Sequence, residues 1–485
     1  MRPTLEEVQK ISESGAYDIC PVCIRIPTGD LSPVEVMKKL LNVSSHCFLL
    51  ESAEQDRTWG RYSFLGFDPK LSITCDDGHM VVGDLKIDTD DPARYIRQVL
   101  EDYRSYKPED FPAFTGGLVG YFSYDYLKYA EPTLRIKAEN SEGFRDVDLM
   151  LFDKAIVFDN IEKEILLIAN VDLKDAEISY NRARMDLESM KELVLNGEKR
   201  KGLGGRLTSD VKPMFDKQRF CSMVEEAKHH IFEGDVFQIV LSNRLEADFE
   251  GSLLPTYNAL RESNPSPYMF YFSGSDMEVA GASPETLVKL ENGVLHTFPL
   301  AGTRPRGKTP EEDERLEKEL LSDEKELAEH NMLVDLGRND IGRIAKFGTV
   351  EVEKYHSIQR FSHVMHIGST VRGDIKDGAD ALDAIDSILP AGTLSGAPKL
   401  RACQLIDSIE GNKRGIYGGA IGYIDFSGNL DTAISIRIAY KKNGKVFVRS
   451  GAGIVADSVP ESEYQECLNK AAAVINALKS TEGME

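Results

Sequence analysis

Short runs of alternating hydrophobic and polar residues dominate the first part of the chain. Two examples are SHCFLLES and DLMLFDKAIVFD, and a period of two is typical of half-buried strands. A charged helical stretch follows from about Asp175 to Leu195. Further along, Phe220, Val224, Ala227 and Ile231 mark one helix face that stops near Gly234, before the strand-like run VFQIVLS. Strands and helices are segregated rather than strictly alternating, which predicts an α+β fold.

One composition break divides the chain. Residues 196–213 (NGEKRKGLGGRLTSDVKP) are rich in Gly, Lys and Arg and lack apolar periodicity, which predicts a linker. The predicted units are therefore residues 1–195 and 214–485. A chain of 485 residues is long enough for two large domains or three of average size.

Two stretches in the second unit predict helices that present glutamates on one face. In LLSDEKELAEHNMLVDLGRND, Leu320, Leu327 and Val334 recur at sevens as a buried stripe of one helix, and Glu326 and Glu329 share a face. The stretch DSVPESEYQECLNKAAAVINAL predicts a second such helix. Its start reads as a capping box, Ser458-x-x-Glu461, with Pro460 in the first turn.

In this second helix, Glu463, Glu466 and Lys470 fall on one face. Taken alone, the spacing also fits two solvated helices in which Glu466 and Lys470 form an i,i+4 ion pair worth about 0.3–0.5 kcal/mol. Four converging carboxylates would instead repel one another unless a cation lay between them. Hard oxygen ligands favour Mg²⁺ or Ca²⁺.

The region between the two glutamate helices is rich in groups that suit an anion. The turn PAGTLSGAPK carries Thr393, Ser395 and Lys399, the strand-like TAISIRIAY carries Arg437, and RSGAGIVAD offers backbone N–H groups. A cation-bridged anionic substrate is the simplest hypothesis for this arrangement.

Charge and composition exclude several classes of function. The net charge is −22, so the chain would be repelled by nucleic acid and by anionic lipid surfaces. No apolar run approaches the ~18 residues that span a bilayer, and the N-terminus lacks a signal-peptide pattern. We therefore expect a cytoplasmic protein without nucleic-acid or membrane partners. Cys20 and Cys23 form the CxxC of a predicted strand and are expected to be reduced core thiols.

Other local motifs do not support a rival chemistry. GAGIVA at 451–456 matches a dinucleotide-binding glycine pattern, but DSVP follows at once and starts a different helix. RGKT at 306–309 lacks the upstream glycine of a phosphate loop. His363 and His366 lie in a predicted strand, where residues three apart point to opposite faces, so a shared metal is not expected.

Several long blocks resemble the chorismate-utilising enzymes, and among them component I of the anthranilate synthases. They include FPLAGTRPRG, DEKELAEHNMLVDLGRNDIGRI, FSHVMHIGSTVRG, PAGTLSGAPKLRACQLIDSIE, RGIYGGAIGYI and SGAGIVADSVPESEYQECLNKA. FLLESAEQDRTWGRYSFLGFDP and GGLVGYFSYDY extend the likeness into the first half. The resemblance implies a four-layer α/β/β/α sandwich of two stacked antiparallel sheets, with the two halves of the chain intermixed.

The resemblance also implies a site for chorismate and Mg²⁺ in the 214–485 region. It implies that Glu329 and Glu466 bind the metal, with Glu326 and Glu463 holding waters or supporting ligands. Tyr417 and Arg437 match the residues that hold the enolpyruvyl carboxylate. The residues implied around the ring carboxylate are Thr393, Gly451, Ala452, Gly453 and Lys470.

Two further matches carry catalytic roles. The resemblance implies that Glu285, in GASPETLVKL, is the general acid for the departing ring hydroxyl, and that His366 completes the later elimination of pyruvate. Aminodeoxychorismate synthases of the common type carry a nucleophilic lysine where this chain has Ala301. Isochorismate and salicylate synthases use a lysine near the position of Gln238. Both departures favour ammonia as nucleophile and anthranilate as product.

The remaining expectations concern partners and regulation. No glutaminase motif is present, so ammonia would come from solution or from a separate glutamine amidotransferase subunit. Residues 1–195 are expected to carry part of a tryptophan feedback site, formed by Leu50 and Ser52 with Pro267, Tyr268 and Met269. Ordinary core strands are the alternative for these segments. The alternatives for the whole chain are an aminodeoxychorismate synthase component that lacks the lysine, and a non-catalytic amino-acid sensor.

Overall fold

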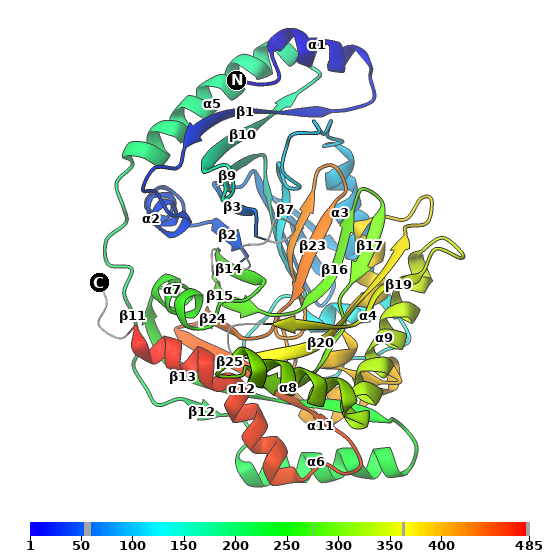
Figure 1. Cartoon of the computed structure of the whole chain (residues 1–485). Coiled ribbons are helices and arrows are strands. Elements are labelled where there is room, and N and C mark those ends of the chain that lie inside the picture. The colour runs from blue at the N-terminus through cyan, green and yellow to red at the C-terminus, as the bar shows by residue number, and fades with distance from the viewer. Residues whose placement is uncertain (53–59, 275, 361–363, 482–485) are drawn as a thin grey trace.

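The structure, a computed structural model, describes residues 1–52, 60–274, 276–360 and 364–481. Two large antiparallel sheets dominate these residues (Figure 1). The path of the first sheet runs in the order β1 (Ile19–Pro27), β10 (Glu164–Asp172), β9 (Lys154–Asp159), β3 (Tyr62–Phe67), β2 (Cys47–Glu51), β14 (Tyr268–Ser273), β15 (Glu278–Ser283), β24 (Ile438–Lys442), β25 (Lys445–Ile454), β13 (Gln238–Gly251) and β11 (Gly205–Leu207). Strands β12 (Lys212–Pro213) and β21 (Gly396–Ala397) also pair with β13.

The second sheet stacks on the first. Its path runs in the order β18 (Leu300–Pro305), β20 (Val364–Asp374), β17 (Val294–Thr297), β16 (Thr286–Glu291), β23 (Leu430–Ile434), β22 (Ala420–Asp425), β7 (Gly117–Phe122), β8 (Val147–Phe152), β4 (Leu71–Asp76), β5 (His79–Val82) and β6 (Leu85–Asp88), and β19 (Glu351–Arg360) pairs with β20. An aromatic-rich core, with Phe48 and Phe270 from the first sheet and Tyr121 and Phe152 from the second, fills the space between them.

Helices cover the outer faces of both sheets. They are α1 (Leu5–Glu13), α2 (Pro33–Val43), α3 (Pro92–Glu101), α4 (Leu127–Ala130), α5 (Ala176–Asn196), α6 (Lys217–Phe232), α7 (Leu254–Ser263), α8 (Pro310–Ser322), α9 (Glu324–Ile344), α10 (Ala381–Ile388), α11 (Lys399–Glu410) and α12 (Pro460–Ser480), with short 3-10 turns η1 (Tyr124–Tyr126) and η2 (Gly392–Leu394). Helices α2, α5, α7 and α12 follow the outer side of the first sheet (Figure 1). Helices α3, α9 and α10 pack on the second sheet. The predicted four-layer α+β sandwich is confirmed.

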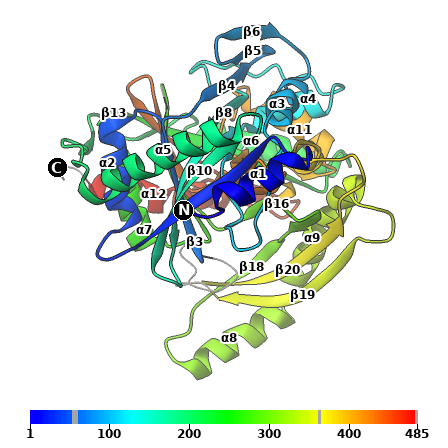
Figure 2. The same cartoon turned by 90° about the horizontal axis from the view of Figure 1, so that it is seen from above.

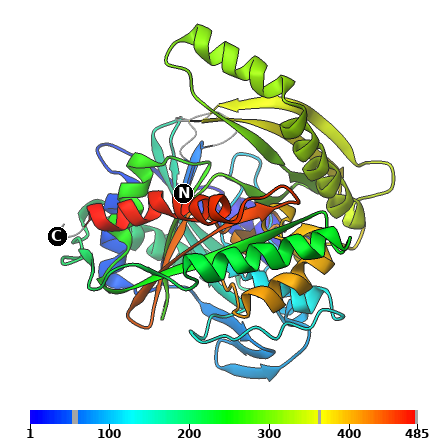
Figure 3. The ribbon, with the colours of Figure 1, turned by 90° about the horizontal axis from the view of Figure 1, so that it is seen from below.

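Part of the second sheet projects from the body as an arm. We define the arm as β18, β19 and β20 with α8 and α9. In the views from above and below, α8 lies at the outer end of this arm (Figures 2 and 3). The fully buried part of its outer core contains Leu320, Met365 and Ile367. The outer end of the arm therefore has a much smaller buried apolar core than the stacked sheets.

Each sheet joins a block of strands from the first half of the chain to a block from the second half. β2 pairs with β14 in the first sheet, and β7 pairs with β22 in the second. Within residues 196–213, β11 and β12 both pair with β13.

Two local expectations about the glutamate helices are wrong. Leu320 is not on the same helix as Leu327 and Val334, because α8 ends at Ser322 and Asp323 caps a new helix by accepting from the N–H groups of Lys325 and Glu326. Ser458 does not form a capping box. The helix begins one residue later than expected, at Pro460, and the Ser458 hydroxyl accepts from the Val455 N–H.

The helix predicted to stop near Gly234 is confirmed. α6 buries Phe220, Val224 and Ala227 on one face. Cys20 and Cys23 lie on β1 and are free buried thiols that pack into different cores, so they do not form a joint metal or redox pair. Across the described residues, no helix combines the length and the apolar character needed to cross a membrane.

The chain crosses between the two sheets at two neighbouring places. One crossing joins β15 to β16 and carries Glu285, and the other joins β23 to β24 and carries Arg437. The crossings are hydrogen-bonded together, because Ile434 N donates to Glu285 O at 2.9 Å and Ala282 N donates to Arg437 O at 3.2 Å. Residues distant in sequence thus meet where the sheets exchange strands.

Candidate functional site

Glu285 is a carboxyl group surrounded by protein at the first crossing. The Thr393 hydroxyl, on the η2 turn, donates to its Oε1 at 3.0 Å. Burial raises the pKa of Glu285 to about 7, although the Thr393 hydrogen bond and the charges of Arg437 and Lys470 act in the opposite direction. Glu285 can therefore hold a proton near neutral pH, as a general acid must.

Arg437 occupies the second crossing with a left-handed backbone, φ 53°, which is uncommon for a residue with a side chain. Its side chain keeps contact with solvent, yet surrounding protein lowers the pKa of its guanidinium. Within residues 1–52, 60–274, 276–360 and 364–481, the guanidinium has no ion-pair or hydrogen-bond partner. A crowded cation without a bonded partner suits a bound carboxylate.

Gly451, Ala452 and Gly453 lie on β25 opposite Ser242, Leu241 and Val240 of β13. A Cβ atom on Gly451 would lie 2.7 Å from the Leu241 carbonyl oxygen and 3.1 Å from the Tyr417 hydroxyl oxygen. Glycine at 451 therefore lets the Leu241 carbonyl and the Tyr417 hydroxyl approach this strand closely. Tyr417 itself is buried just before β22.

The α12 carboxylates lie beside the same strand. Lys470 Nζ donates to the Gly451 carbonyl oxygen at 3.1 Å and forms an ion pair with Glu466 at 2.7 Å. Both side chains stay about half exposed, at 54% and 46%. Burial raises the pKa of Glu463, and the neighbouring Glu466 charge adds to the shift.

Glu326 and Glu329 face this helix from α9 in the arm. Burial raises the pKa of Glu329, and the charges of Glu326 and Glu466 add to the shift. Arg304 Nη1 lies 3.4 Å from Glu326 Oε1. The four predicted metal residues therefore belong to two helices from different parts of the molecule.

The chemistry of these four carboxylates fits a hard divalent cation. Their oxygen donors are the ligands that Mg²⁺ prefers, and the mutual repulsion between Glu329, Glu326 and Glu466 is the kind that a cation would relieve. Their oxygens are not gathered within 4.8 Å of one another in the structure. Among the described residues, the acidic cluster that meets this distance is Asp76, Asp77 and Asp146, where Lys128 and Lys413 already supply positive charge.

His366 lies on β20 of the arm. Its Nδ1 is 2.9 Å from the Gly302 carbonyl oxygen, so the neutral ring is the tautomer with its proton on Nδ1 and its lone pair on Nε2. Burial lowers the pKa of His366, and Arg437 adds to the effect. The ring therefore suits proton abstraction near pH 7. His363 lies outside the described residues.

Two groups in the glycine-rich turn have other partners. Lys399 Nζ donates to Asp340 Oδ2 at 2.8 Å and to the Ile388 carbonyl oxygen at 2.9 Å. The buried Ser395 hydroxyl donates to the Ala391 carbonyl oxygen. Of the three side chains expected on this turn, Thr393 is the one that contacts a catalytic candidate.

The interpretation of the sequence missed a charged network behind this turn. Glu410, Arg414 and Arg449 are almost fully buried and bonded to one another. The available signal was an arginine inside the apolar strand run VFVRSG, since a buried charge requires a partner.

The predicted tryptophan residues divide between two faces of the first sheet. Leu50 and Tyr268 pack against the core between the sheets, and the Tyr268 hydroxyl donates to Asp431 at 2.8 Å. Met269 packs into the outer core on the opposite face. Ser52 and Pro267 lie at the adjoining strand ends. A single ligand could therefore not contact the side chains of both Leu50 and Met269 on one face.

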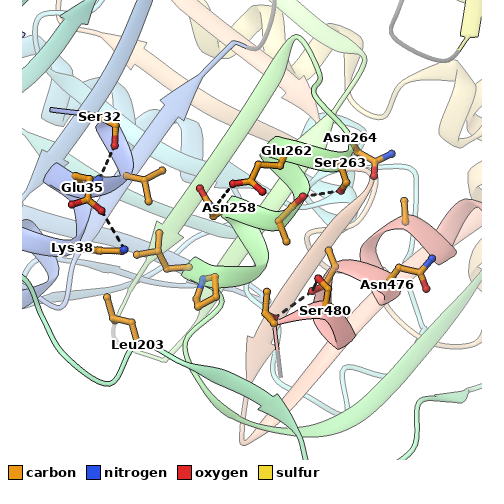
Figure 4. A pocket seen from close by; sticks show the side chains of 17 residues that line it. Ser32, Glu35, Lys38, Leu203, Asn258, Glu262, Ser263, Asn264, Asn476 and Ser480 are labelled. Atoms are coloured by element: carbon orange, nitrogen blue, oxygen red, sulfur yellow. Dashed lines mark hydrogen bonds and ion pairs between the residues drawn. The ribbon is translucent and has the colours of Figure 1, made fainter. Parts of the chain in front are cut away.

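A cavity of about 900 Å³ lies elsewhere, between α2, α7 and α12 (Figure 4). Ser32, Asn258, Asn264 and Asn476 are among its lining residues. None of the predicted catalytic, chorismate-binding or metal residues lines it. We therefore place the candidate active site at the sheet crossings, where the predicted catalytic residues lie, and not in this cavity.

Ala301 and Gln238, which the resemblance implies as the positions that differ between related enzymes, lie beside the candidate site. Ala301 is buried on β18, next to Gly302, whose carbonyl oxygen holds His366. Gln238 begins β13, and its Nε2 lies 2.8 Å from where a Cβ atom on Gly453 would be. Neither side chain can serve as a nucleophile or a strong base.

Comparison with known proteins shows which family the chain belongs to. The family model for chorismate binding enzymes matches residues 45–476. Anthranilate synthase component 1 from Acetivibrio thermocellus is 43% identical over 489 residues, covering 98% of each chain. The corresponding protein from Aquifex aeolicus is 43% identical over 495 residues, covering 99% of this chain and 98% of its own.

Solved structures extend the comparison to the fold. Anthranilate synthase component I from Streptococcus pneumoniae aligns with a TM-score of 0.78 at 38% identity, covering 93% of this chain and 99% of its own. The menaquinone-specific isochorismate synthase from Escherichia coli aligns with a TM-score of 0.71 over 98% of both chains, but at 20% identity it supports the fold alone. The family model and the relatives together show that the chain belongs to the chorismate binding enzyme family.

Proposed function

We propose that the chain is component I of an anthranilate synthase, which aminates chorismate with ammonia and eliminates pyruvate to form anthranilate. The observation that carries the proposal is Glu285, a proton-holding carboxyl oriented by Thr393 and flanked by the cations Arg437 and Lys470. The near full-length similarity to anthranilate synthase components gives independent support.

The residues of the site divide the work of substrate binding. Arg437 and Tyr417 hold the enolpyruvyl carboxylate, for which a guanidinium without a bonded partner is well suited. The ring carboxylate lies toward Thr393, the backbone of residues 451–453 and Lys470. Chorismate is a dianion, so two separate cationic groups fix its orientation as well as its affinity.

Proton transfers fall to two residues. Glu285 donates a proton to the ring hydroxyl as it leaves, while ammonia attacks the ring carbon next to the one that bears the carboxylate. His366 then removes a ring proton during the loss of pyruvate, which makes the ring aromatic. Its neutral form, held by the Gly302 carbonyl, is the form that can accept a proton.

Glu329 and Glu466 would bind Mg²⁺, with Glu326 and Glu463 supporting them. The bound ion supplies Lewis-acid stabilisation of the negative charge on the substrate. Lys470, now paired with Glu466, remains beside the Gly451 carbonyl to contact the substrate carboxylate.

Ammonia is the nucleophile in this proposal, because Ala301 and Gln238 replace the lysines used by related enzymes. A separate glutamine amidotransferase subunit would deliver it, and tryptophan would inhibit the enzyme through Ser52, Leu50 and the segment at Tyr268. Seven free cysteines suit the reducing cytoplasm, where we place the enzyme.

Fluorescence detection of anthranilate tests the proposal directly. The purified chain should form anthranilate from chorismate, Mg²⁺ and an ammonium salt, and should ignore glutamine. Adding an amidotransferase subunit should restore activity with glutamine. Chorismate consumption without anthranilate, or with aminodeoxychorismate as the final product, would overturn the assignment, and no consumption at all would favour a non-catalytic sensor.

A further inference from the structure

A buried charged network lies directly behind the candidate site. It consists of Glu410 at the end of α11, Arg414 before β22, Arg449 on β25 and Ser242 on β13, which we call the Glu410 network. These four residues are between 0% and 4% exposed. The sequence motifs and the proposed mechanism give none of them a role.

Glu410 is the centre of the network and binds both arginines. Its Oε1 accepts from Arg414 Nη2 at 2.6 Å and from the Ser242 N–H and hydroxyl at 2.8 and 2.9 Å. Its Oε2 accepts from Arg414 Nε at 3.0 Å and from Arg449 Nη2 at 2.7 Å. Both guanidiniums are thus held in fixed orientations by one carboxylate.

The outer ends of the network reach the backbone that carries the site. Arg414 Nη1 donates at 2.6 Å to the carbonyl oxygen of Leu394, the neighbour of Thr393. Arg414 Nη2 donates at 2.7 Å to the carbonyl oxygen of Val240, which pairs with Gly453. One side chain therefore connects the Thr393 turn to the strand opposite the glycines.

The other arginine connects the network to the glycine strand itself. Arg449 lies two residues before Gly451, and its Nε donates to the Ser242 hydroxyl at 2.8 Å. Ser242 pairs with Gly451 across the ladder. Both guanidinium carbons lie 6.0 Å from the centre of the Tyr417 ring. The network thus contacts three segments that would surround the substrate.

Stability alone does not explain these charges. A buried ion pair gains little over well-packed apolar residues of similar volume, because desolvating the charges offsets their attraction. Such a network does, however, allow one arrangement of donors and acceptors and penalises others. Here that arrangement determines where Thr393, Tyr417 and residues 451–453 lie relative to one another.

We propose that Glu410, Arg414 and Arg449 are positioning residues, which hold the Thr393 turn, Tyr417 and the 451–453 strand at the spacing that chorismate requires. The proposal rests on the proposed function. None of the three has to touch the substrate, since they act through the backbone carbonyls and the ladder.

Arg414→Lys is the most direct test. Lysine keeps the charge but cannot donate to Leu394, Val240 and Glu410 at once. We expect the KM for chorismate to rise by about tenfold or more and kcat to fall, because misplaced groups bind and orient the substrate poorly.

The pH dependence gives a readout that lost stability would not move. The groups that face Glu285 are Thr393, Arg437 and Lys470, and the Thr393 hydrogen bond lowers the pKa of Glu285. If Arg414 holds Thr393 in place, the variant loses that hydrogen bond. The alkaline limb of the kcat profile should then move to higher pH by about 0.5 or more.

Leu167→Ala is the matched control. Leu167 is fully buried in the outer core on β10, and its truncation destabilises the fold without contacting the network. It should lower the melting temperature while leaving KM and the pH limb unchanged. If Arg414→Lys does not fold, Ser242→Ala removes one hydroxyl of the network, and its KM should still rise by a factor of about three or more.

The outcomes separate this proposal from the function on which it rests. A wild-type chain that forms no anthranilate overturns the proposed function. An active wild type with unchanged KM and pH limb in the tested variant overturns the positioning role alone. Changes of the same kind in Leu167→Ala would also overturn it, because they would make the effect one of stability.

Discussion

The body of two stacked sheets and the projecting arm each contribute part of the site, but they hold their residues differently. In the body, Tyr417 is buried and Thr393 is bonded to Glu285, with a charged network behind them. In the arm, Glu326 and Glu329 lie on a helix whose outer neighbours share a core centred on Leu320, Met365 and Ile367. The hydrogen bonds and packing of the body therefore hold its site residues in place without a ligand.

The difference indicates that the arrangement of the carboxylates between the arm and the body depends on a bound cation. The carboxylates of Glu329 in the arm and Glu466 in the body repel each other. In the structure, Glu466 forms an ion pair with Lys470. A cation between α9 and α12 would join the two regions in addition to its chemical role. The following predictions test the separate roles of the arm residues and the body residues.

The largest effect is expected from the carboxylates that span the two regions. Glu329→Gln and Glu466→Gln should each lower anthranilate formation by about a thousandfold, equivalent to ~4 kcal/mol in the barrier, because the ion loses a ligand. Rates with saturating ammonium measure the loss, and a chelator should reproduce it in the wild type. Glu324→Gln and Glu461→Gln, on the first turns of the same helices, are matched controls that should stay active.

If Glu466→Gln is inactive while Glu329→Gln keeps more than about a tenth of the rate, a loss under ~1.4 kcal/mol, the arm does not share the ion and the comparison fails.

His366→Met tests the general base that the arm is proposed to contribute. Loss of a general base should lower anthranilate formation by about a hundredfold or more, while chorismate is still consumed and an aminated, non-aromatic intermediate accumulates. Chromatography of the reaction mixture measures all three species. His296→Gln, on the neighbouring strand β17, is the control. Equal loss of chorismate consumption and product, with no intermediate, would assign His366 to the first step instead.

The pH dependence of the rate tests the role of Glu285, the proposed general acid in the body. Glu285 donates only when protonated, and its pKa is raised to about 7 by burial, so the active form is lost as pH rises through that value. At constant free ammonia, the rate should fall about tenfold per pH unit above pH ~7. Glu285→Gln should be slow and should lack this limb. A limb that persists in Glu285→Gln belongs to another group.

The smallest effect is expected in the body, at the proposed tryptophan site. Ser52→Phe should leave turnover near normal and raise the tryptophan concentration for half inhibition by about tenfold, within the usual range of coupling energies. Inhibition curves with ammonium measure this shift. A wild type that ignores millimolar tryptophan with both ammonium and glutamine would remove the regulatory site and leave the catalytic proposal standing.

The sequence by itself determined local secondary structure, the family and the types of side chain available at the site. The face formed by Phe220, Val224 and Ala227 is a helix, and the CxxC run is a strand, because periodicity reflects interactions between near neighbours. The long blocks identified the family before any contact was known. They also supplied Ala301 and Gln238, whose identities narrow the chemistry without any geometry.

Only the tertiary structure decided which of these residues meet and what their surroundings do to them. Glu285 and Arg437 are neighbours because two strand crossings pair, and burial there raises the pKa of the one and lowers that of the other. Met269 and Leu50 separate because cross-strand register assigns their faces. Desolvation and long-range pairing depend on contacts between distant segments, and the spacing of residues along one segment carries no information about them.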